Sequence, residues 1–314
     1  MNDRHHFYYR KQFRWLIPLI NKAKQVSFPG FDKLPIFNVL LFFLRGIRDG
    51  RVIARAEAVS FNLVLAVFPA ILFLFTLIPL IPIDNFQNDL LLLIQSLLPA
   101  STYGVVQRII EDIITIKHGG LLSFGFGFAL VFSTNGIVSL IDAFNASIHV
   151  EESRSWVMQR GIALILMVTL VTLVTFGVSL MTITHRLMDF LVAQELMIQG
   201  WLYYMVNIGK WVVILGVFYF AYSFLYYWGP TKKGQYRFIS AGASLATLLS
   251  ILITTGFGFY IDHFSRYNAL YGSIGTLPII MLMIFCYSLA IIIGFELNIG
   301  IVTARNVNLI EENP

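Results

Sequence analysis

The sequence predicts an all-α, polytopic membrane protein with six transmembrane helices, together with amphipathic helices near the N-terminus and on the external side. Composition and one long apolar run support this fold class. Hydrophobic residues make up 57% of the chain and charged residues only 12%, whereas soluble domains carry about 25% charged residues. The run from Ala58 to Ile83 has no charged side chain. At about 1.5 Å per residue it is long enough to cross a hydrocarbon core of about 30 Å.

Residues 1–34 form a basic segment in which Lys and Arg are interleaved with aromatic residues. Such a mixture can grip phosphates and stack bases in a nucleic acid, or it can lie on an anionic lipid leaflet. In a chain this apolar we favour the lipid surface and expect no nucleic-acid partner. The segment has no adequate apolar stretch before a small-residue cleavage site, so we expect no cleaved signal peptide.

Residues 35–303 are expected to form a membrane domain of six spans. The apolar run in Pro35–Gly50 is too short to span, so we expect an amphipathic helix that lies along the membrane surface. The first span is expected at Ala56–Ile81, where Pro69 removes a backbone hydrogen bond and predicts a kink. Leu90–Pro99 is again too short to cross and predicts a helix on the external side.

Five further apolar segments complete the six predicted spans. Their expected positions are Leu121–Ile148, Gly161–Thr184, Tyr203–Trp228, Phe238–Tyr260 and Ile274–Val302. The fifth span carries a cluster of small residues between Ala241 and Ala246, as membrane helices that pack closely prefer. Residues 304–314 follow as a short tail.

The basic residues of the loops predict how the chain is oriented. With six spans, 17 Lys and Arg residues fall on one side of the membrane and 4 on the other, and Lys210 lies inside the fourth span. Positively charged loops stay in the cytoplasm. We therefore expect both termini to be cytoplasmic. The single cysteine, Cys286, excludes a disulfide within the chain.

Polar residues from several spans are expected in the cytoplasmic third of the membrane, with Asn135 deeper, and form a candidate polar pocket. Its members are Glu57, Asn62, Asn135, Asp142, Asn145, Arg154, Glu296 and Asn298. One interpretation is a cavity for a charged headgroup, attracted by Arg154 and Arg160. The other is a set of helix caps and interhelix salt bridges. The candidate pairs for such bridges join Arg55 or Arg154 to Asp142 or Glu296.

Asn135 and Lys210, two polar residues inside predicted spans, each have two possible roles. Asn135, near the middle of the second span, either hydrogen-bonds across helices or marks a break in the helix at a substrate site. Lys210 either extends its ammonium group to the membrane surface or pairs with Asp262 or Glu195. We name Lys210, Asp262 and His263 as a candidate external polar group. The histidines are too scattered to predict a metal site.

Enzyme signatures are absent from the sequence. It contains no GxxxxGK[ST] loop, which would cradle nucleotide phosphates, no HExxH and no GxSxG. No cluster of carboxylates is placed to hold the two metals of a nuclease. We therefore expect no catalytic residues, no cofactor and no bound metal, and a protein that is not an enzyme.

Four stretches of the chain resemble the YihY/BrkB family of membrane proteins. They are Ala56–Pro69, Ser133–Val150, Tyr226–Pro230 and Leu270–Asn298, which include AVSFN, STNGI, YYWGP and GFELN. The resemblance implies a six-span inner-membrane protein. The family has been labelled ribonuclease BN-like, but its association with envelope integrity and lipopolysaccharide export implies a lipid or another amphiphile as substrate.

The leading hypothesis is a transporter or flippase-like protein that handles an amphiphile or envelope lipid without ATP. The alternative is a non-transporting scaffold for envelope assembly, and a membrane nuclease is the least favoured. Expected partners are membrane lipids, including anionic headgroups. An oligomer is compatible with the sequence.

Overall fold

The computed structural model describes residues 26–27, 30–32, 34–77, 130–147, 152–193, 201–232, 236–263 and 273–312, and the single residues 22 and 127. Within these ranges every regular element is a helix. The helices are α3 (Ile36–Asp49), α4 (Val52–Leu77), α8 (Asn135–Ser147), α9 (Trp156–Ala193), α10 (Trp201–Trp228), α11 (Ala241–His263) and α13 (Ser273–Glu312). The predicted all-α class is thus confirmed. The predicted external helix Leu90–Pro99 lies outside the described residues.

Four of these helices contain a stretch that is long and apolar enough to cross a membrane. The stretches are Trp156–Gly177, Trp211–Trp228, Ala241–Tyr260 and Pro278–Asn308. They coincide with the third to sixth predicted spans. The first two predicted spans are helical where they are described, in α4 and α8, and their outer portions lie outside the described residues. The structure therefore supports four of the six predicted crossings.

Two helices run further than the sequence analysis expected. α9 extends from Trp156 to Ala193, and α13 continues from Ser273 to Glu312 through most of the predicted tail. No glycine or proline follows Gly300 before Glu312, so the backbone has no residue that would end the helix. α4 continues through Pro69, as expected for the first predicted span.

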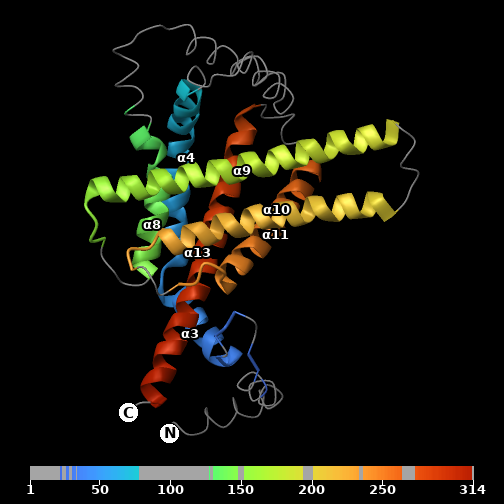
Figure 1. Ribbon diagram of the computed structural model, residues 1–314. Helices are drawn as coiled ribbons and strands as arrows, with labels where there is room; N and C mark the ends of the chain where they lie inside the picture. The colour runs from blue at the N-terminus through green and yellow to red at the C-terminus, as the bar shows by residue number, and fades with distance from the viewer. Residues whose placement is uncertain are drawn as a thin grey trace.

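α13 is the helix against which most of the described bundle packs. It contacts α3, α4, α8 and α11, while α10 lies between α9 and α11 and α8 contacts both α4 and α9. In Figure 1, α4, α8 and α13 run roughly along the height of the view, and the α9–α10 pair lies across them. α3 sits beside the lower half of α13 in the same view. The two directions meet where α8, α10 and α13 converge.

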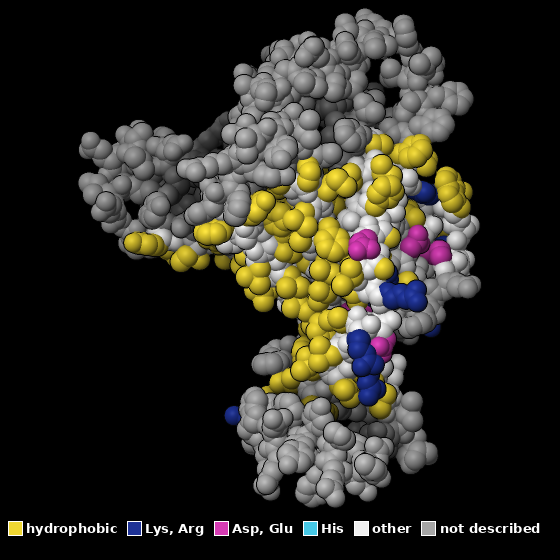
Figure 2. Space-filling model, turned by 180° about the vertical axis from the view of Figure 1, so that it is seen from behind, with side chains coloured by type: hydrophobic (Ala, Val, Ile, Leu, Met, Phe, Trp, Pro, Cys, Tyr) yellow, Lys and Arg dark blue, Asp and Glu magenta, His cyan; other side chains and the backbone are white. Residues whose placement is uncertain are grey.

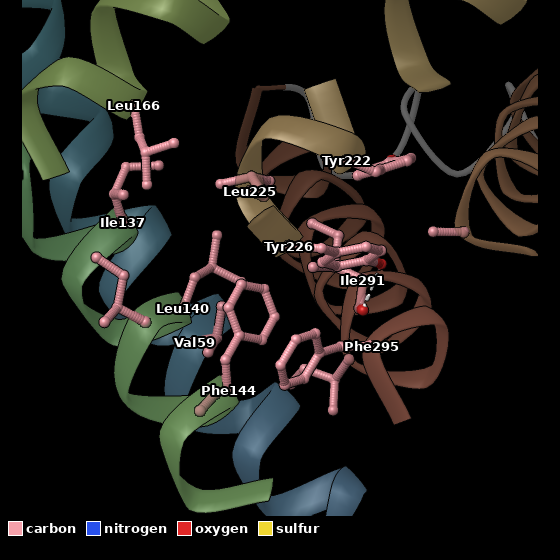
Figure 3. Close-up of a cluster of buried hydrophobic side chains, with 14 of the residues drawn as sticks. Val59, Ile137, Leu140, Phe144, Leu166, Tyr222, Leu225, Tyr226, Ile291 and Phe295 are labelled. Carbon is pink, nitrogen blue, oxygen red and sulfur yellow. Dashed lines mark hydrogen bonds between the residues drawn. The ribbon is translucent and has the colours of Figure 1, made fainter. Parts of the chain in front are cut away.

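A cluster of buried aromatic side chains fills this meeting point, which we call the junction. Phe144 of α8, Tyr226 of α10 and Phe295 of α13 are each 0% exposed. Their ring centroids lie 5.6 Å (Phe144–Tyr226), 4.4 Å (Phe144–Phe295) and 5.6 Å (Tyr226–Phe295) apart. Tyr226 also donates a hydrogen bond to the Ile291 carbonyl at 2.7 Å, the dashed line in Figure 3. One core thus joins three helices from distant parts of the sequence.

α11 and α13 approach each other closely at two glycines. A Cβ atom on Gly242 would lie 2.1 Å from the Gly294 carbonyl oxygen, and one on Gly294 would lie 2.6 Å from the Gly242 carbonyl oxygen. Contacts this short leave no room for a side chain on either helix. Gly242 belongs to the small-residue cluster of the fifth predicted span, so the sequence-based expectation of close packing is confirmed there.

The exterior of the described helices is strongly apolar away from the junction. On α9, Val168, Val174 and Phe176 are 52–59% exposed, and on α10 Ile208 and Val212 are 63% and 60% exposed. Figure 2 shows a broad hydrophobic face, with charged side chains gathered along one edge and beside α3. A soluble domain rarely exposes an apolar face of this extent. The surface is typical of helices that face hydrocarbon.

Candidate functional site

An ion pair holds α4 and α13 together at the edge of the junction. Arg55 of α4 donates to Glu296 of α13 and to the hydroxyl of Ser147, and also to the Ala143 carbonyl at 3.0 Å. The side chains of Arg55 and Glu296 are only 12% and 3% exposed. One guanidinium therefore joins three helices, α4, α8 and α13. This pair is one of the interhelix salt bridges that the sequence analysis offered as an interpretation.

α3 covers the same ion pair. A Cβ atom on Gly46 would lie 2.6 Å from Oε2 of Glu296, so the helix backbone rests almost directly on the carboxylate. Val39 of α3 packs with Leu297 and Ile301 in a second buried cluster on α13. The amphipathic helix expected at Pro35–Gly50 therefore exists as α3, and its apolar side packs against α13. Its position along the membrane surface stays a prediction.

A second polar network joins the end of α8 to the loop before α9 and to the loop after α10. Arg154 donates to both carboxylate oxygens of Glu152, at 2.7 and 2.6 Å, and to the Gly229 carbonyl and the Thr231 hydroxyl at 3.0 and 3.1 Å. Asn145 donates to Glu152 at 2.9 Å and accepts from the Thr231 backbone N–H at 2.9 Å. Arg154 therefore pairs with Glu152, and not with Asp142 or Glu296.

The hydrogen bonds from Arg154 lower the pKa of Glu152 to about 2, against a partial opposing effect of burial. Glu152 is therefore ionised across the physiological pH range. With its charge neutralised by Arg154 and its oxygens occupied, this carboxylate serves to hold the loops together.

The helix that precedes α8 is interrupted at Thr134. Residues 130–133 are helical, Thr134 is a turn, and α8 begins at Asn135. Arg160 of α9 donates to the Val131 carbonyl and the Thr134 hydroxyl, each at 3.0 Å, and to the Asn135 side chain at 2.5 Å. Its guanidinium also lies over the Trp156 ring, 5.4 Å from the centroid. The expected hydrogen bond from Asn135 across helices is confirmed, and the helix is interrupted next to it. That this interruption marks a substrate site stays a prediction.

Three further members of the candidate polar pocket each form hydrogen bonds to a different neighbouring element. Asn62 donates to Ser139 at 3.1 Å, linking α4 to α8. Asn298 accepts from the Gly242 N–H at 2.9 Å and donates to Ser240 at 3.1 Å, linking α13 to the start of α11. Asp142 accepts from Gln159 at 2.8 Å. Of the eight residues, the structure joins Asn145 with Arg154 through Glu152. Asn62, Asn135, Asp142, Glu296 and Asn298 take part in separate contacts.

The candidate external polar group cannot be placed in the same detail. Lys210 lies within α10, and Asp262 and His263 are at the end of α11. The side chains of all three lie outside the described residues. Within the described part of the chain, no three His, Cys, Asp or Glu side chains are grouped as metal ligands would be.

Glu57 is the member of the candidate pocket that lines a sizeable cavity. A groove of about 390 Å³ lies between α4 and α13 and is bordered by Glu57, Ser60, Phe61, Val64, Met281 and Phe285. Its volume falls in the range of about 300–1,000 Å³ that is usual for small-molecule sites. We call it the α4–α13 groove. Among the described residues of its lining, Glu57 supplies a carboxylate, Ser60 supplies a hydroxyl, and the other four are apolar.

The family of the chain is shown by comparison with family models. The model described as virulence factor BrkB matches residues 43–313. The chain belongs to the BrkB family. This assignment confirms the resemblance noted in the four sequence stretches, all of which lie within the matched range.

Relatives within and around the BrkB family carry membrane and ribonuclease-like names. The chain is 30% identical over 278 residues to the ribonuclease-like protein YfkH of Bacillus subtilis (strain 168), covering 87% of this chain and 97% of YfkH. It is 22% identical over 299 residues to a UPF0761 membrane protein of Xanthomonas axonopodis pv. citri (strain 306), covering 91% of this chain and 64% of that one. No solved structure matches the chain. Together with the apolar helices, these similarities make the chain an integral membrane protein.

Sequence reasoning missed several residues that the site depends on. Glu152 was overlooked as the partner of Arg154, although the two are separated by a single residue. Ser147 and Gly46, which contact the Arg55–Glu296 pair, carry no charge and give no signal in the sequence. Met281 and Phe285 line the groove but resemble any other apolar residue of a span.

Proposed function

We propose that this BrkB-family protein handles an amphiphile, as a transporter or flippase-like protein that does not use ATP. The observation that supports the proposal is the α4–α13 groove. Its apolar walls suit the acyl chain of a lipid, and the carboxylate at one end suits a polar headgroup. The groove borders the apolar exterior, so a lipid could enter it from the side.

The helices that form the groove could also move relative to each other. α4 contains Pro69 and α13 contains Pro278, and each proline removes one backbone hydrogen bond from its helix. The Arg55–Glu296 ion pair joins the same two helices at the end that is remote from the two prolines. A change in the angle between α4 and α13 would widen or close the groove while that pair held their ends together.

We further propose an inner-membrane location with both termini in the cytoplasm, as the loop charges predict. In this orientation the Glu57 end of the groove lies near the cytoplasmic leaflet. Arg45, Arg48 and Arg51 are exposed on α3 and at the start of α4. They would contact the anionic phosphates of that leaflet, since each basic residue near such a surface contributes about 1 kcal/mol. The partners proposed are membrane lipids, without nucleic acid.

Reconstitution tests this function. Full-length protein in vesicles is supplied with phosphatidylethanolamine or phosphatidylglycerol carrying a fluorophore on an acyl chain, and a membrane-impermeant reductant reports which leaflet holds the probe. We expect faster exchange between leaflets than in empty vesicles. Met281→Trp should fill the groove and abolish the difference. Leu282→Trp is the matched control, because Leu282 is 53% exposed on the next position of α13 and does not line the groove. Equal exchange with and without protein would contradict transport.

A non-transporting scaffold is the second candidate, and it is favoured by the paired polar residues. Arg55, Arg154 and Arg160 all donate to groups of neighbouring helices and loops, as a rigid support would require. A scaffold would give tight protein partners on crosslinking in cells and no lipid exchange in vesicles.

We propose no enzymatic activity, although YfkH is named ribonuclease-like. The carboxylates of Asp142 and Glu296 are already bonded, to Gln159 and Arg55 respectively. A metal-dependent ribonuclease assay on purified protein, with Asp142→Ala and Glu296→Ala as controls, tests this. Ribonuclease activity that is present in the wild-type protein and lost in a folded Asp142→Ala variant would overturn the proposal.

A further inference from the structure

Glu57 differs from the other carboxylates whose side chains the structure describes. Each of the others has a partner: Asp32 with Arg237 and Arg305, Asp49 with Arg48, Asp142 with Gln159, Glu152 with Arg154 and Glu296 with Arg55. The Glu57 carboxylate has neither an ion pair nor a hydrogen bond in this part of the chain. It is exposed, and the space it borders is the α4–α13 groove.

The α4 residues that line the groove all lie on one face of that helix. Glu57, Ser60, Phe61 and Val64 follow the i, i+3, i+4, i+7 pattern of a single helix face, and Met281 and Phe285 are one turn apart on α13. The Ser60 hydroxyl donates to the backbone carbonyl of Glu57 at 2.9 Å. The Ser60 hydroxyl has therefore used its one proton, and among the described residues that line the groove the Glu57 carboxylate is the one charged group.

A carboxylate beside hydrocarbon needs a counter-charge, because charged groups are costly there. An anionic lipid would repel it. A quaternary ammonium group carries positive charge but has no N–H to donate. A primary ammonium supplies both the charge and three donors, and such charge-assisted hydrogen bonds are the strong ones.

We propose that the α4–α13 groove binds a phospholipid with a primary-amine headgroup. The ammonium group lies on the Glu57 carboxylate, and an acyl chain lies against Phe61, Val64, Met281 and Phe285. This rests on the proposed function only in naming the groove as the amphiphile site, and it specifies the headgroup that the site selects. Lipid is favoured over a soluble amine because the rest of the lining is apolar: Phe61 is 59% and Met281 42% exposed.

Lipid retention by the purified full-length protein tests the proposal. The protein is placed in nanodiscs of phosphatidylethanolamine, phosphatidylcholine and phosphatidylglycerol in equal parts, extracted in mild detergent, and its bound lipids are measured by native mass spectrometry. We expect roughly tenfold enrichment of phosphatidylethanolamine over the other two, as one charge-assisted hydrogen bond would give. Glu57→Gln should remove the enrichment. Asp49→Asn, which removes another exposed carboxylate, should leave it unchanged.

Three results would overturn the proposal: no enrichment in the wild-type protein, equal enrichment in Glu57→Gln, or displacement of the lipid by free ethanolamine, which would indicate a site for soluble amines. Met281→Trp gives an independent arm that keeps the carboxylate, and it should lower retention of all three lipids. The result is separable from transport. Selective retention without leaflet exchange would reject the proposed function alone, and exchange without selectivity would reject this inference alone.

Discussion

Arg55 and Glu296 are 241 positions apart in the sequence and form an ion pair in which Glu296 is only 3% exposed. The same arginine also reaches the Ser147 hydroxyl and the Ala143 carbonyl of α8. A polar residue that could be mistaken for part of a substrate pocket therefore serves to hold three helices together. The predictions below separate this structural role from the role of the groove.

Breaking the Arg55–Glu296 pair from one side should destabilise the protein strongly. Glu296→Leu leaves a buried guanidinium uncompensated, and we expect a loss of about 3–5 kcal/mol. The double variant Arg55→Met/Glu296→Leu should lose less than the sum of the single variants. Thermal unfolding in detergent, followed by tryptophan fluorescence, measures this. Asp49→Asn is the control, because the Arg48–Asp49 side chains are 83% and 62% exposed and such a pair contributes at most about 1 kcal/mol. Additive losses would show that the pair is not coupled.

The close approach of α11 and α13 should not tolerate a side chain at Gly242. We expect Gly242→Ala to destabilise the fold by about 1–3 kcal/mol or more, because its Cβ would overlap the Gly294 carbonyl. Gly256→Ala, on the same helix with nothing within 4 Å of a Cβ, should be neutral or stabilising, since alanine favours helix over glycine. The unfolding temperatures of the two variants in detergent test this difference. Similar values would mean that the helices are further apart than described.

The Glu152–Arg154 network should make stability depend on pH at the acidic end. The folded-state pKa of Glu152 is about 2, below its ordinary 4.5, so the folded state favours the ionised carboxylate. This contribution is complete above pH 4.5 and is lost as pH falls from there toward 2. The difference in unfolding temperature between wild type and Glu152→Gln should therefore shrink with falling pH. A difference that stayed constant down to pH of about 3 would contradict the assignment.

The hydrogen bonds of Arg160 should protect the backbone amides around the helix break at Thr134 from hydrogen exchange. Arg160→Met removes the donor to the Val131 carbonyl and to the Thr134 and Asn135 side chains. We expect amide hydrogen exchange near Thr134 and Val138 to accelerate by roughly tenfold or more. Gln159→Ala, which removes a neighbouring hydrogen bond to Asp142, should leave these amides unchanged. Equal rates in both variants would show that the break is held by other contacts.

Features that follow from local patterns were predictable from the sequence. Long, largely apolar runs predicted the helices α9, α10, α11 and α13, because their length and composition suit a bilayer whatever they pack against. The small residues around Gly242 predicted close packing, and Asn135 in the STNGI stretch predicted either a hydrogen bond across helices or a break in the helix. Arg55 and Glu296 were considered as partners because both carry charge at the same expected depth.

Features that depend on how distant helices meet were not predictable. The α4–α13 groove brings Glu57 together with Met281 and Phe285, and no local pattern relates residues so far apart. The same holds for the junction of Phe144, Tyr226 and Phe295, whose rings look in sequence like ordinary apolar residues of a span. Eight polar residues were grouped by depth alone, since depth can be inferred from the chain, whereas the direction of each side chain around its helix axis depends on its neighbours.

A structure of the full-length protein in nanodiscs that contain phosphatidylethanolamine tests the central claim most directly. The account predicts ordered lipid density in the α4–α13 groove, with the headgroup within hydrogen-bonding distance of Glu57 and a chain beside Met281 and Phe285. A groove without lipid, and with the Glu57 carboxylate paired to a cationic side chain of the protein, would contradict it.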